Sequence, residues 1–350
     1  MASTDRRRLH FVGSLPQFDD AKSAFRWQQD ELAGCVRRLS GGETGPRLQW
    51  FVPLVKALKG LAHIRTVQDG EWTGYDDTDR LKVQRGSRLT PGDIPMRLGE
   101  YAREELVALD ALGTPASADL PLQVGVPGYL DMALFIFGPV GVFRHARAFR
   151  DATAEQIADV HRAAGDAVVF QLEVPAALIA VVSAPRPLRP LLARLMARLV
   201  TSQVAKAPRG SRFGVHLCLG DLGHRALKIP SSAAPQVLLA NALVRRWPRD
   251  RPLEFVHLPL SGGDQPPVTS AAYYDPLRRL RVPADVPVVA GIAHEEQSVG
   301  DQVAVRALVD GALGRRADIA TACGLGRRTS EQAVRAVDNM RVLLDDQNGG

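Results

Sequence analysis

The stretch from Arg212 to Leu258 decides the fold. It contains the segments RFGVHLCL (residues 212–219), PQVLLANALVRR (235–246) and LEFVHL (253–258). The first and third are short and largely apolar, as buried strands are, whereas the middle one repeats apolar residues at helical spacing. A strand, a helix and a second strand in this order form the unit from which parallel sheets covered by helices are built.

The same alternation extends in both directions along the chain. The predicted strands are Leu9–Leu15, His63–Val67, Leu120–Val126, Ala167–Glu173, Arg212–Leu219, Leu253–Leu258, Val286–Ala293 and Ala317–Ala322. The predicted helices include Ile94–Leu112, Ala154–Ala164, Pro235–Arg246, Val299–Leu313 and Ser330–Leu344. Eight strand–helix units predict an α/β fold, a single (β/α)8 barrel over about residues 9–345 with an N-terminal helical extension, in one domain spanning 1–350.

Finer features of the chain fit this plan. Thr329 and Gln332 have the spacing of a capping box at the start of the last helix. Ser261–Pro267 is expected to be a long loop after the sixth strand, and the end of the chain, Asn348–Gly350, is expected to fray. Cys35 lies in an expected helical stretch, Glu31–Leu39, as a packed thiol.

Composition and charge exclude several classes of protein. The formal net charge is +6, but the longest basic run, Arg6-Arg7-Arg8, is short and lacks interleaved aromatic residues, so we expect no nucleic-acid partner. The surplus suits an anionic substrate better. No apolar stretch approaches the roughly 18–20 residues that cross a bilayer, and the N-terminus lacks the apolar core of a signal peptide, so we expect a cytoplasmic protein without membrane contact. The sequence carries no indication of oligomeric state.

Reactive side chains gather at the predicted strand ends. Barrel enzymes build their sites at the C-terminal ends of the strands, and five consecutive strands end near Glu173, His216, Cys218, His257, His294 and Cys323. The whole chain has only eight His and three Cys. This concentration predicts a site at that end of the barrel.

The pair His216 and Cys218 indicates a metal site. Two residues apart on a strand, both side chains point to one face, and imidazole nitrogen with thiolate sulfur suits zinc. Cys323, at another strand end and followed by Gly-Leu-Gly, supplies a third ligand. His257 is the first candidate for the fourth position, with Glu254 or a substrate thiol as alternatives. One Zn²⁺ per chain would turn a bound thiol into a nucleophilic thiolate at neutral pH.

Two further residues have catalytic or binding interpretations. His294 could protonate a leaving group or hold an acidic substrate, or it could simply be hydrogen-bonded at a strand end. Glu173 lies in an apolar strand, where a carboxylate is costly unless paired. It could receive a substrate ammonium group or form a structural ion pair.

The motifs together resemble a known family. Phe11–Pro16, Phe170–Ala176, His216–Asp221 and Cys323–Gly326 are similar, in the same order, to the catalytic domain of cobalamin-independent methionine synthase, among the uroporphyrinogen decarboxylase/methionine synthase-like barrels. The resemblance implies a barrel whose zinc, held by an H-x-C pair, a distant Cys and a Glu, activates homocysteine thiol to accept a methyl group from a folate. His216, Cys218 and Cys323 match three of these ligands.

The resemblance also implies substrate-binding residues. Glu173 stands where the family holds the amino group of the thiol substrate, and Gln171, Ser14 and Asp221 belong to the same motifs. Glu43 and Arg47 are further candidates, with a structural ion pair as the alternative. The implied partners are a small-molecule thiol and an alkyl donor, a folate or another methyl donor.

Departures from the family pattern point to a separate branch. The family's strand-four motif Q-x-D-E-P has Glu173 and Val174 in place of its two acids, and its strand-six zinc Glu has no clear equivalent. Gly41–Trp50, Tyr274–Leu277 and Gly291–His294 look like a branch of short methionine-synthase-like proteins in which His257 and His294 belong to the pattern.

Three alternatives stay open beside transfer of a methyl or other alkyl group to a zinc-activated thiol. One is an epoxide-opening thiol transferase similar to epoxyalkane:coenzyme M transferase. Another is a metal-free decarboxylase resembling uroporphyrinogen decarboxylase, which does not need the H-x-C and distant Cys set. The third is a barrel that binds or stores zinc without catalysis.

Overall fold

A seven-stranded parallel sheet forms the centre of the molecule. In this computed structural model, which describes residues 6–49, 51–113 and 120–344, its strand order is β1-β4-β5-β6-β7-β8-β9. The strands are β1 (Leu39–Ser40), β4 (Leu122–Pro127), β5 (Val168–Glu173), β6 (Arg212–His216), β7 (Leu253–Pro259), β8 (Val288–Ala293) and β9 (Asp318–Thr321). Their residues are largely buried, because helices cover the outside and side chains fill the inside.

The first chain segment closes this sheet into a barrel. Leu9 forms parallel bridges both to Val36, just before β1, and to Ile319 in β9. The Leu9 amide donates to the Cys35 carbonyl oxygen at 2.7 Å, and the His10 amide donates to the Ile319 carbonyl oxygen at 2.8 Å. The two edges of the sheet therefore meet through one residue, which confirms the predicted barrel architecture.

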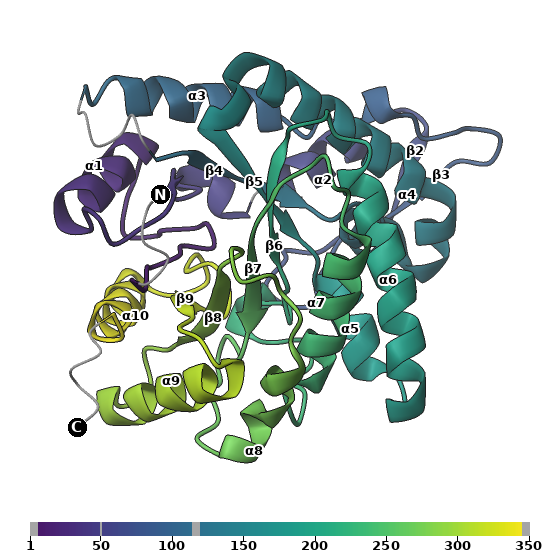
Figure 1. The fold of residues 1–350 in the computed structure, drawn as a ribbon. Helices are drawn as coiled ribbons and strands as arrows, with labels where there is room; N and C mark the ends of the chain where they lie inside the picture. Colours follow the sequence, from purple (N-terminus) through teal and green to yellow (C-terminus); the bar gives the residue numbers. More distant parts are fainter. Residues whose placement is uncertain (1–5, 50, 114–119, 345–350) are drawn as a thin grey trace.

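Helices surround the barrel (Figure 1). They are α1 (Ala21–Glu31), α2 (Phe51–Lys59), α3 (Leu98–Asp110), α4 (Tyr129–Ala164), α5 (Pro175–Ser183), α6 (Arg189–Val204), α7 (Ala234–Arg246), α8 (Ala271–Tyr274), α9 (Val299–Leu313) and α10 (Ser330–Val342). α1 is the N-terminal helical segment, between the Leu9 segment and β1. α4 is interrupted at Gly138, which has a φ of 70° and is followed by Pro139. Among the described residues, no helix is long and apolar enough to cross a membrane.

Most expected elements are confirmed. The third to eighth predicted strands correspond to β4–β9, and the expected helices correspond to α3, the second half of α4, α7, α9 and α10. The capping box is present, because the Thr329 side chain accepts from the Gln332 amide and the Gln332 side chain accepts from the Thr329 amide. Residues 261–267 form neither helix nor strand. Asn348–Gly350 lie outside the described residues.

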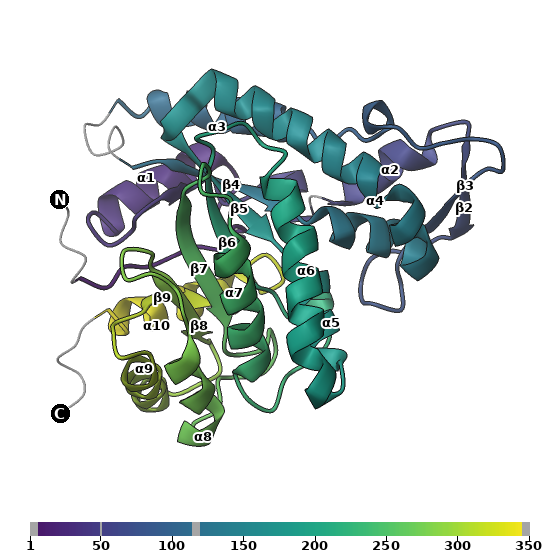
Figure 2. The same ribbon diagram turned by 45° about the vertical axis from the view of Figure 1, so that its right-hand side comes forward.

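The second predicted strand exists, but its predicted place in the barrel was wrong. Residues of His63–Val67 form β2 (Ile64–Gln68), which pairs antiparallel with β3 (Arg80–Val83) in a separate hairpin. This hairpin projects from the barrel beside α2 and α4 (Figure 2). The position in the barrel belongs to β1, which pairs with β4. The alternation of the hairpin sequence imitated a barrel strand, whereas β1 has only two residues.

The setting expected for Cys35 also needs correction. α1 ends at Glu31, and Cys35 lies in the turn that follows rather than in a helix. Its side chain packs against the core, as expected, although it is only partly buried.

Candidate metal centre and adjoining cavity

Two strand ends bring one imidazole and two thiols together. His216 is the last residue of β6, Cys218 follows two positions later, and Cys323 follows β9 by two positions. One ligand atom from each of the three lies within 4.8 Å of the others, and the two Sγ atoms are 3.8 Å apart. Two sulfurs about 2.3 Å from one tetrahedral zinc ion would lie about 3.8 Å apart, so this spacing fits a shared ion.

A chain of hydrogen bonds leaves one nitrogen of His216 free for a metal. His257 Nε2 lies 3.0 Å from the Thr321 carbonyl oxygen, which only accepts, so Nε2 carries the proton. Burial lowers the pKa of His257 to about 4, which keeps the ring neutral and makes its Nδ1 an acceptor. His216 Nδ1 then donates to it across 2.7 Å. His216 Nε2, buried and without a hydrogen-bond partner, keeps its lone pair.

The structure places His257 beside His216 but outside the group of close ligand atoms. His216 and His257 are register partners on β6 and β7, so their rings lie side by side, with centroids 4.6 Å apart. Both nitrogens of His257 are engaged, and the group of close ligand atoms does not include it. Its position suits a residue that orients a ligand from behind. Glu254, the other candidate, pairs with Arg212, at 2.8 Å.

The Cys323 thiol resists ionisation. The contact with Cys218, and then burial, raise the pKa of the Cys323 thiol well above its usual value. The Gly220 amide donates to Cys218 Sγ at 3.2 Å. Two adjacent thiolates need a nearby positive charge, and a divalent cation supplies it. Together with the free His216 nitrogen, this donor set fits zinc.

A cavity of about 160 Å³ adjoins the two thiols. Much of its wall is apolar, formed by residues that include Val12, Leu48, Phe51, Trp72, Met132 and Ile136. Trp72 and Tyr75 come from the connection between β2 and β3, so the inserted hairpin contributes to the cavity. The Leu222 amide donates to the Tyr75 hydroxyl at 3.2 Å, and this bond links the hairpin to the loop that follows Cys218.

Two carboxylates face each other in the cavity wall. A Cβ on Gly125 would lie 2.9 Å from Glu43 Oε1 and 3.6 Å from Glu173 Oε1, so the two side chains flank one glycine. Burial raises the pKa of Glu43, although the hydrogen bond from Ser14 opposes it. Burial, and then the charge of Glu43, raise the pKa of Glu173 well above its usual value. A cationic group of a ligand would relieve this repulsion.

Three other expected substrate-binding residues have distinct places. Ser14 lines the cavity and donates to Glu43 Oε2 at 2.7 Å. Gln171 is fully buried and does not line it: its amide donates to the Val12 carbonyl oxygen and to Glu173 Oε1, and its oxygen contacts His10 Nε2. Arg47 forms an ion pair with Glu105, which is the alternative expected for it from the sequence. Gln171 thus lies behind the cavity wall, whereas Arg47 lines a smaller cavity beside Glu43 and Glu173.

Asp221 lines the cavity with unsatisfied acceptors. Its side chain is buried, and neither carboxylate oxygen accepts a hydrogen bond from the described part of the chain. The His224 ring lies nearby, with Nδ1 3.8 Å from Asp221 Oδ1. Burial raises the pKa of Asp221 to about 6 against the charge of Arg328. A ligand that donates hydrogen bonds would be held here.

Comparison with solved structures finds barrels of the same fold. No family model and no curated protein matches the sequence. A B12-independent methionine synthase from Shewanella sp. W3-18-1, in complex with selenomethionine, superposes with a TM-score of 0.60 at 14% identity over 97% of each chain. The chain has the fold of this enzyme.

Two more structures show the same likeness. A candidate vitamin B12-independent methionine synthase from Listeria monocytogenes gives a TM-score of 0.53 at 15% identity, over 94% of this chain and 87% of that one. A methyltransferase from Methanosarcina mazei gives 0.50 at 15% identity, over 97% and 94%. The methionine-synthase-like barrel therefore extends over nearly the whole chain.

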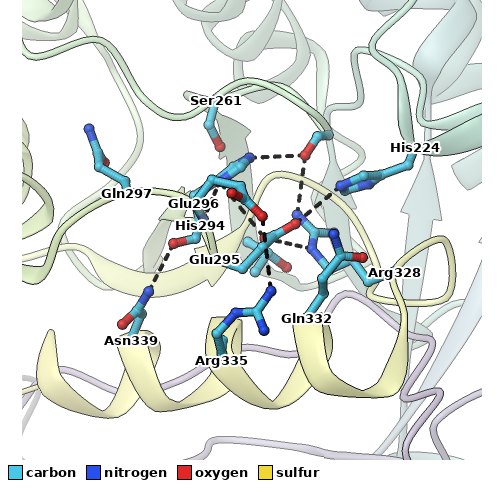
Figure 3. Close-up of polar contacts among 12 residues, drawn as sticks. His224, Ser261, His294, Glu295, Glu296, Gln297, Arg328, Gln332, Arg335 and Asn339 are labelled. Carbon is cyan, nitrogen blue, oxygen red and sulfur yellow. Dashed lines mark hydrogen bonds and ion pairs between the residues drawn. The ribbon is translucent and has the colours of Figure 1, made fainter.

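His294 does not lie where a catalytic acid is needed. Its Nε2 donates to the Gly263 carbonyl oxygen at 3.0 Å, and its Nδ1 accepts from the Glu296 amide at 3.1 Å (Figure 3). It is fully buried and does not line the cavity. These contacts match the alternative interpretation, a histidine hydrogen-bonded at a strand end.

A buried ion cluster lies next to His294. Glu295 Oε2 accepts from Arg328 Nε at 2.8 Å, its Oε1 lies 3.1 Å from His224 Nε2, and the Glu295 and Arg328 side chains are 0% exposed. Burial alone would raise the pKa of Glu295, but His224 and Arg328 outweigh it and lower the pKa to about 2. This cluster joins the loops after β6, β8 and β9 (Figure 3). The first and third of these loops carry Cys218 and Cys323.

Several cavity residues were missed in the sequence. Asp131 lines the cavity at the start of α4, and burial raises its pKa to about 7. Its place three residues after the Pro-Gly that follows the third predicted strand was a usable signal. Arg327 follows the Cys-Gly-Leu-Gly motif and was equally visible. Trp72 and Tyr75 were hidden, because the hairpin that carries them was assigned to the barrel.

Proposed function

We propose that the protein transfers a methyl or other alkyl group to a thiol with the help of one zinc ion. The observation that carries the proposal is the group of His216, Cys218 and Cys323, with a free imidazole nitrogen and two sulfurs 3.8 Å apart beside a cavity. A catalytic zinc needs three such protein ligands and an open position toward its substrate. The likeness to methionine synthases and a methyltransferase supports alkyl transfer as the reaction class.

The residues around the cavity would have different roles in the reaction. His216, Cys218 and Cys323 would hold the ion, which supplies the positive charge that keeps a substrate thiol deprotonated at neutral pH. Glu43 and Glu173 would bind a cationic group, and Asp221 a hydrogen-bond donor, of the reactants. The apolar wall excludes water from the sulfur. The substrate sulfur forms a bond to the alkyl carbon while the bond between that carbon and the donor breaks. The electron pair of the broken bond stays with the donor.

The donor is proposed only by class. A folate or another methyl donor fits alkyl transfer. An epoxide would be opened by the same sulfur, and its ring oxygen would then take up the electron pair and a proton. Both reactions use one ion and one thiol.

Metal content tests the proposal most directly. We expect roughly one zinc per chain in protein purified without chelators, and loss of that zinc in His216→Ala and in Cys323→Ser. Cys35→Ser is the matched control, because Cys35 lies outside the group of close ligand atoms. Native protein that takes up no zinc, or Cys323→Ser protein that retains it fully, would overturn the proposal.

Absorption at the zinc edge separates a catalyst from a storage barrel. Adding a substrate thiol should raise the number of sulfur neighbours of the ion by about one. A shell unchanged by every thiol tested favours zinc binding without catalysis.

A further inference from the structure

Two neighbouring arginines follow the Cys-Gly-Leu-Gly motif, and their surroundings differ. Arg328 is buried, and its guanidinium is bonded to Glu295 at 2.8 Å. Arg327 lines the cavity beside the thiols. The first arginine therefore belongs to the scaffold, whereas the second faces the place where reactants would bind.

Arg327 has no hydrogen bond and no ion pair with any residue among 6–49, 51–113 and 120–344. Its one close contact of defined type is with Phe51, whose ring centre lies 5.8 Å from the guanidinium carbon. Its positive charge acts on Glu43 and Asp221, but Arg47 acts more strongly on Glu43, and Arg328 acts more strongly on Asp221. Arg327 is thus not needed to neutralise a particular protein acid.

An unpaired guanidinium in a largely apolar cavity indicates an anionic ligand. Arginine offers five donors in a planar fork and does not lose its proton in proteins, so it cannot escape the cost of partial burial by becoming neutral. A carboxylate or sulfonate, which accepts two parallel hydrogen bonds, matches that fork. The neighbouring Phe51 ring offers an apolar surface but no acceptor for these donors.

The position of Arg327 in the chain decides which reactant carries the anion. It lies four residues after Cys323, a separation of at most about 14 Å even for extended chain, and the segment is a turn. Gly324 and Gly326 between them also line the cavity. One small molecule can therefore place its sulfur beside Cys323 and its acid on Arg327, because the two groups belong to one short loop.

We propose that Arg327 binds the anionic group, a carboxylate or a sulfonate, of the thiol substrate. This inference rests on the proposed function, because it assumes that a thiol approaches the metal. Arg327 sets specificity for the acceptor, while His216, Cys218 and Cys323 hold the ion.

Matched thiols test this assignment on cobalt-substituted protein, where sulfur binding produces a thiolate-to-metal absorption band. 2-Mercaptoethanesulfonate and 3-mercaptopropionate carry the anion, and 2-mercaptoethanol lacks it. In the native sequence we expect the anionic thiols to bind about 10- to 100-fold more tightly than the neutral one. In Arg327→Gln this preference should fall to within about threefold, whereas Arg327→Lys should keep part of it.

Two controls keep the outcomes distinct. Arg335→Gln removes a half-exposed arginine of α10 and should leave the preference unchanged. Binding of 2-mercaptoethanol and the cobalt content should be equal in Arg327→Gln and the native protein, which shows that the variant is folded. Equal affinity for charged and neutral thiols, or a preference that survives Arg327→Gln, overturns the role of Arg327 alone. No new band with any thiol in the native protein overturns the proposed function itself.

Discussion

Two groups of polar residues lie at the same end of the barrel, and they differ in whether their carboxylates are bonded. In the ion cluster, both oxygens of Glu295 are bonded, one to Arg328 and one to His224, although Arg328 Nη1 and His224 Nδ1 have no hydrogen-bond partner in the described chain. Next to the cluster, both ring nitrogens of His294 have backbone partners. In the metal centre and its cavity, His216 Nε2 and both oxygens of Asp221 have no partner in the described chain.

This difference separates scaffold from site. Buried polar groups are normally hydrogen-bonded, and an exception needs an explanation, such as an absent ligand or ion. Residue type does not make the distinction, because histidines and carboxylates occur in both groups. The Glu295 carboxylate holds loops in place, and the unpaired oxygens of Asp221 at the cavity and the unpaired nitrogen of His216 beside the two thiols are those left for ligands.

The largest expected effect comes from breaking the ion cluster. Glu295→Gln leaves Arg328 buried without its counter-charge, and breaking a buried pair typically costs about 3–5 kcal/mol. Urea unfolding of metal-free protein measures the loss. Glu296→Gln is the control, because its contact with Arg335, at 4.0 Å, is more than half exposed. A cost below about 1 kcal/mol would show that the cluster is not a structural element.

The same carboxylate predicts a dependence of stability on pH. The pKa of Glu295 is lowered from 4.5 to about 2, so the folded state favours the ionised form. Its contribution is present above about pH 4.5 and is lost as the pH falls toward 2. The free energy of unfolding of metal-free protein should decline through this window, and the decline should be shallower in Glu295→Gln. Identical slopes in the two proteins would contradict the assignment.

A smaller effect is expected behind the metal centre. His257→Phe removes the acceptor for His216 Nδ1, so the hydrogen bond that leaves His216 Nε2 free for a metal is lost. Loss of such a supporting partner typically weakens metal binding about 10- to 100-fold. Competition with a chromophoric chelator measures the affinity. Unchanged affinity would remove the supporting role. Two nitrogen neighbours of zinc in the native protein would make His257 a ligand after all.

The smallest effect should come from a surface pair. Arg97 and Glu100 are bonded at 2.6 Å, yet both side chains are nearly half exposed. Exposed pairs contribute about 0–1 kcal/mol, and salt weakens them. Arg97→Gln should change the free energy of unfolding by no more than about 0.5 kcal/mol in 0.15 M salt. A loss close to that of Glu295→Gln would show that burial is not what separates the pairs.

The barrel could be predicted because its strands are apolar and regularly spaced by helices. β4 to β9 follow this rule. The two-residue β1 does not, since its pairing depends on position rather than composition, and the more strand-like hairpin residues took its place in the prediction. Local patterns cannot distinguish a strand of the barrel from a strand of an insertion.

The metal-binding group was predictable from spacing, whereas its surroundings were not. His216 and Cys218 share a face by the period of a strand, and Cys323 follows from the topology of the barrel. The roles of His257 and His294 depend on which carbonyl and amide groups reach their rings, and these come from remote segments such as Thr321 and Gly263. Whether a ring nitrogen has a hydrogen-bond partner therefore depends on the tertiary structure and cannot be read from the local sequence.

The bridges of Leu9 have a consequence for biosynthesis. They join the start of the chain to Ile319, and the two thiols of the metal centre are separated by 105 positions. A growing polypeptide cannot complete the cylinder, or bring these sulfurs together, until the ribosome has added the ninth strand and the loop beyond it. Loading of the proposed ion would therefore be a late event, and an ion captured earlier would be held by one half of the site only.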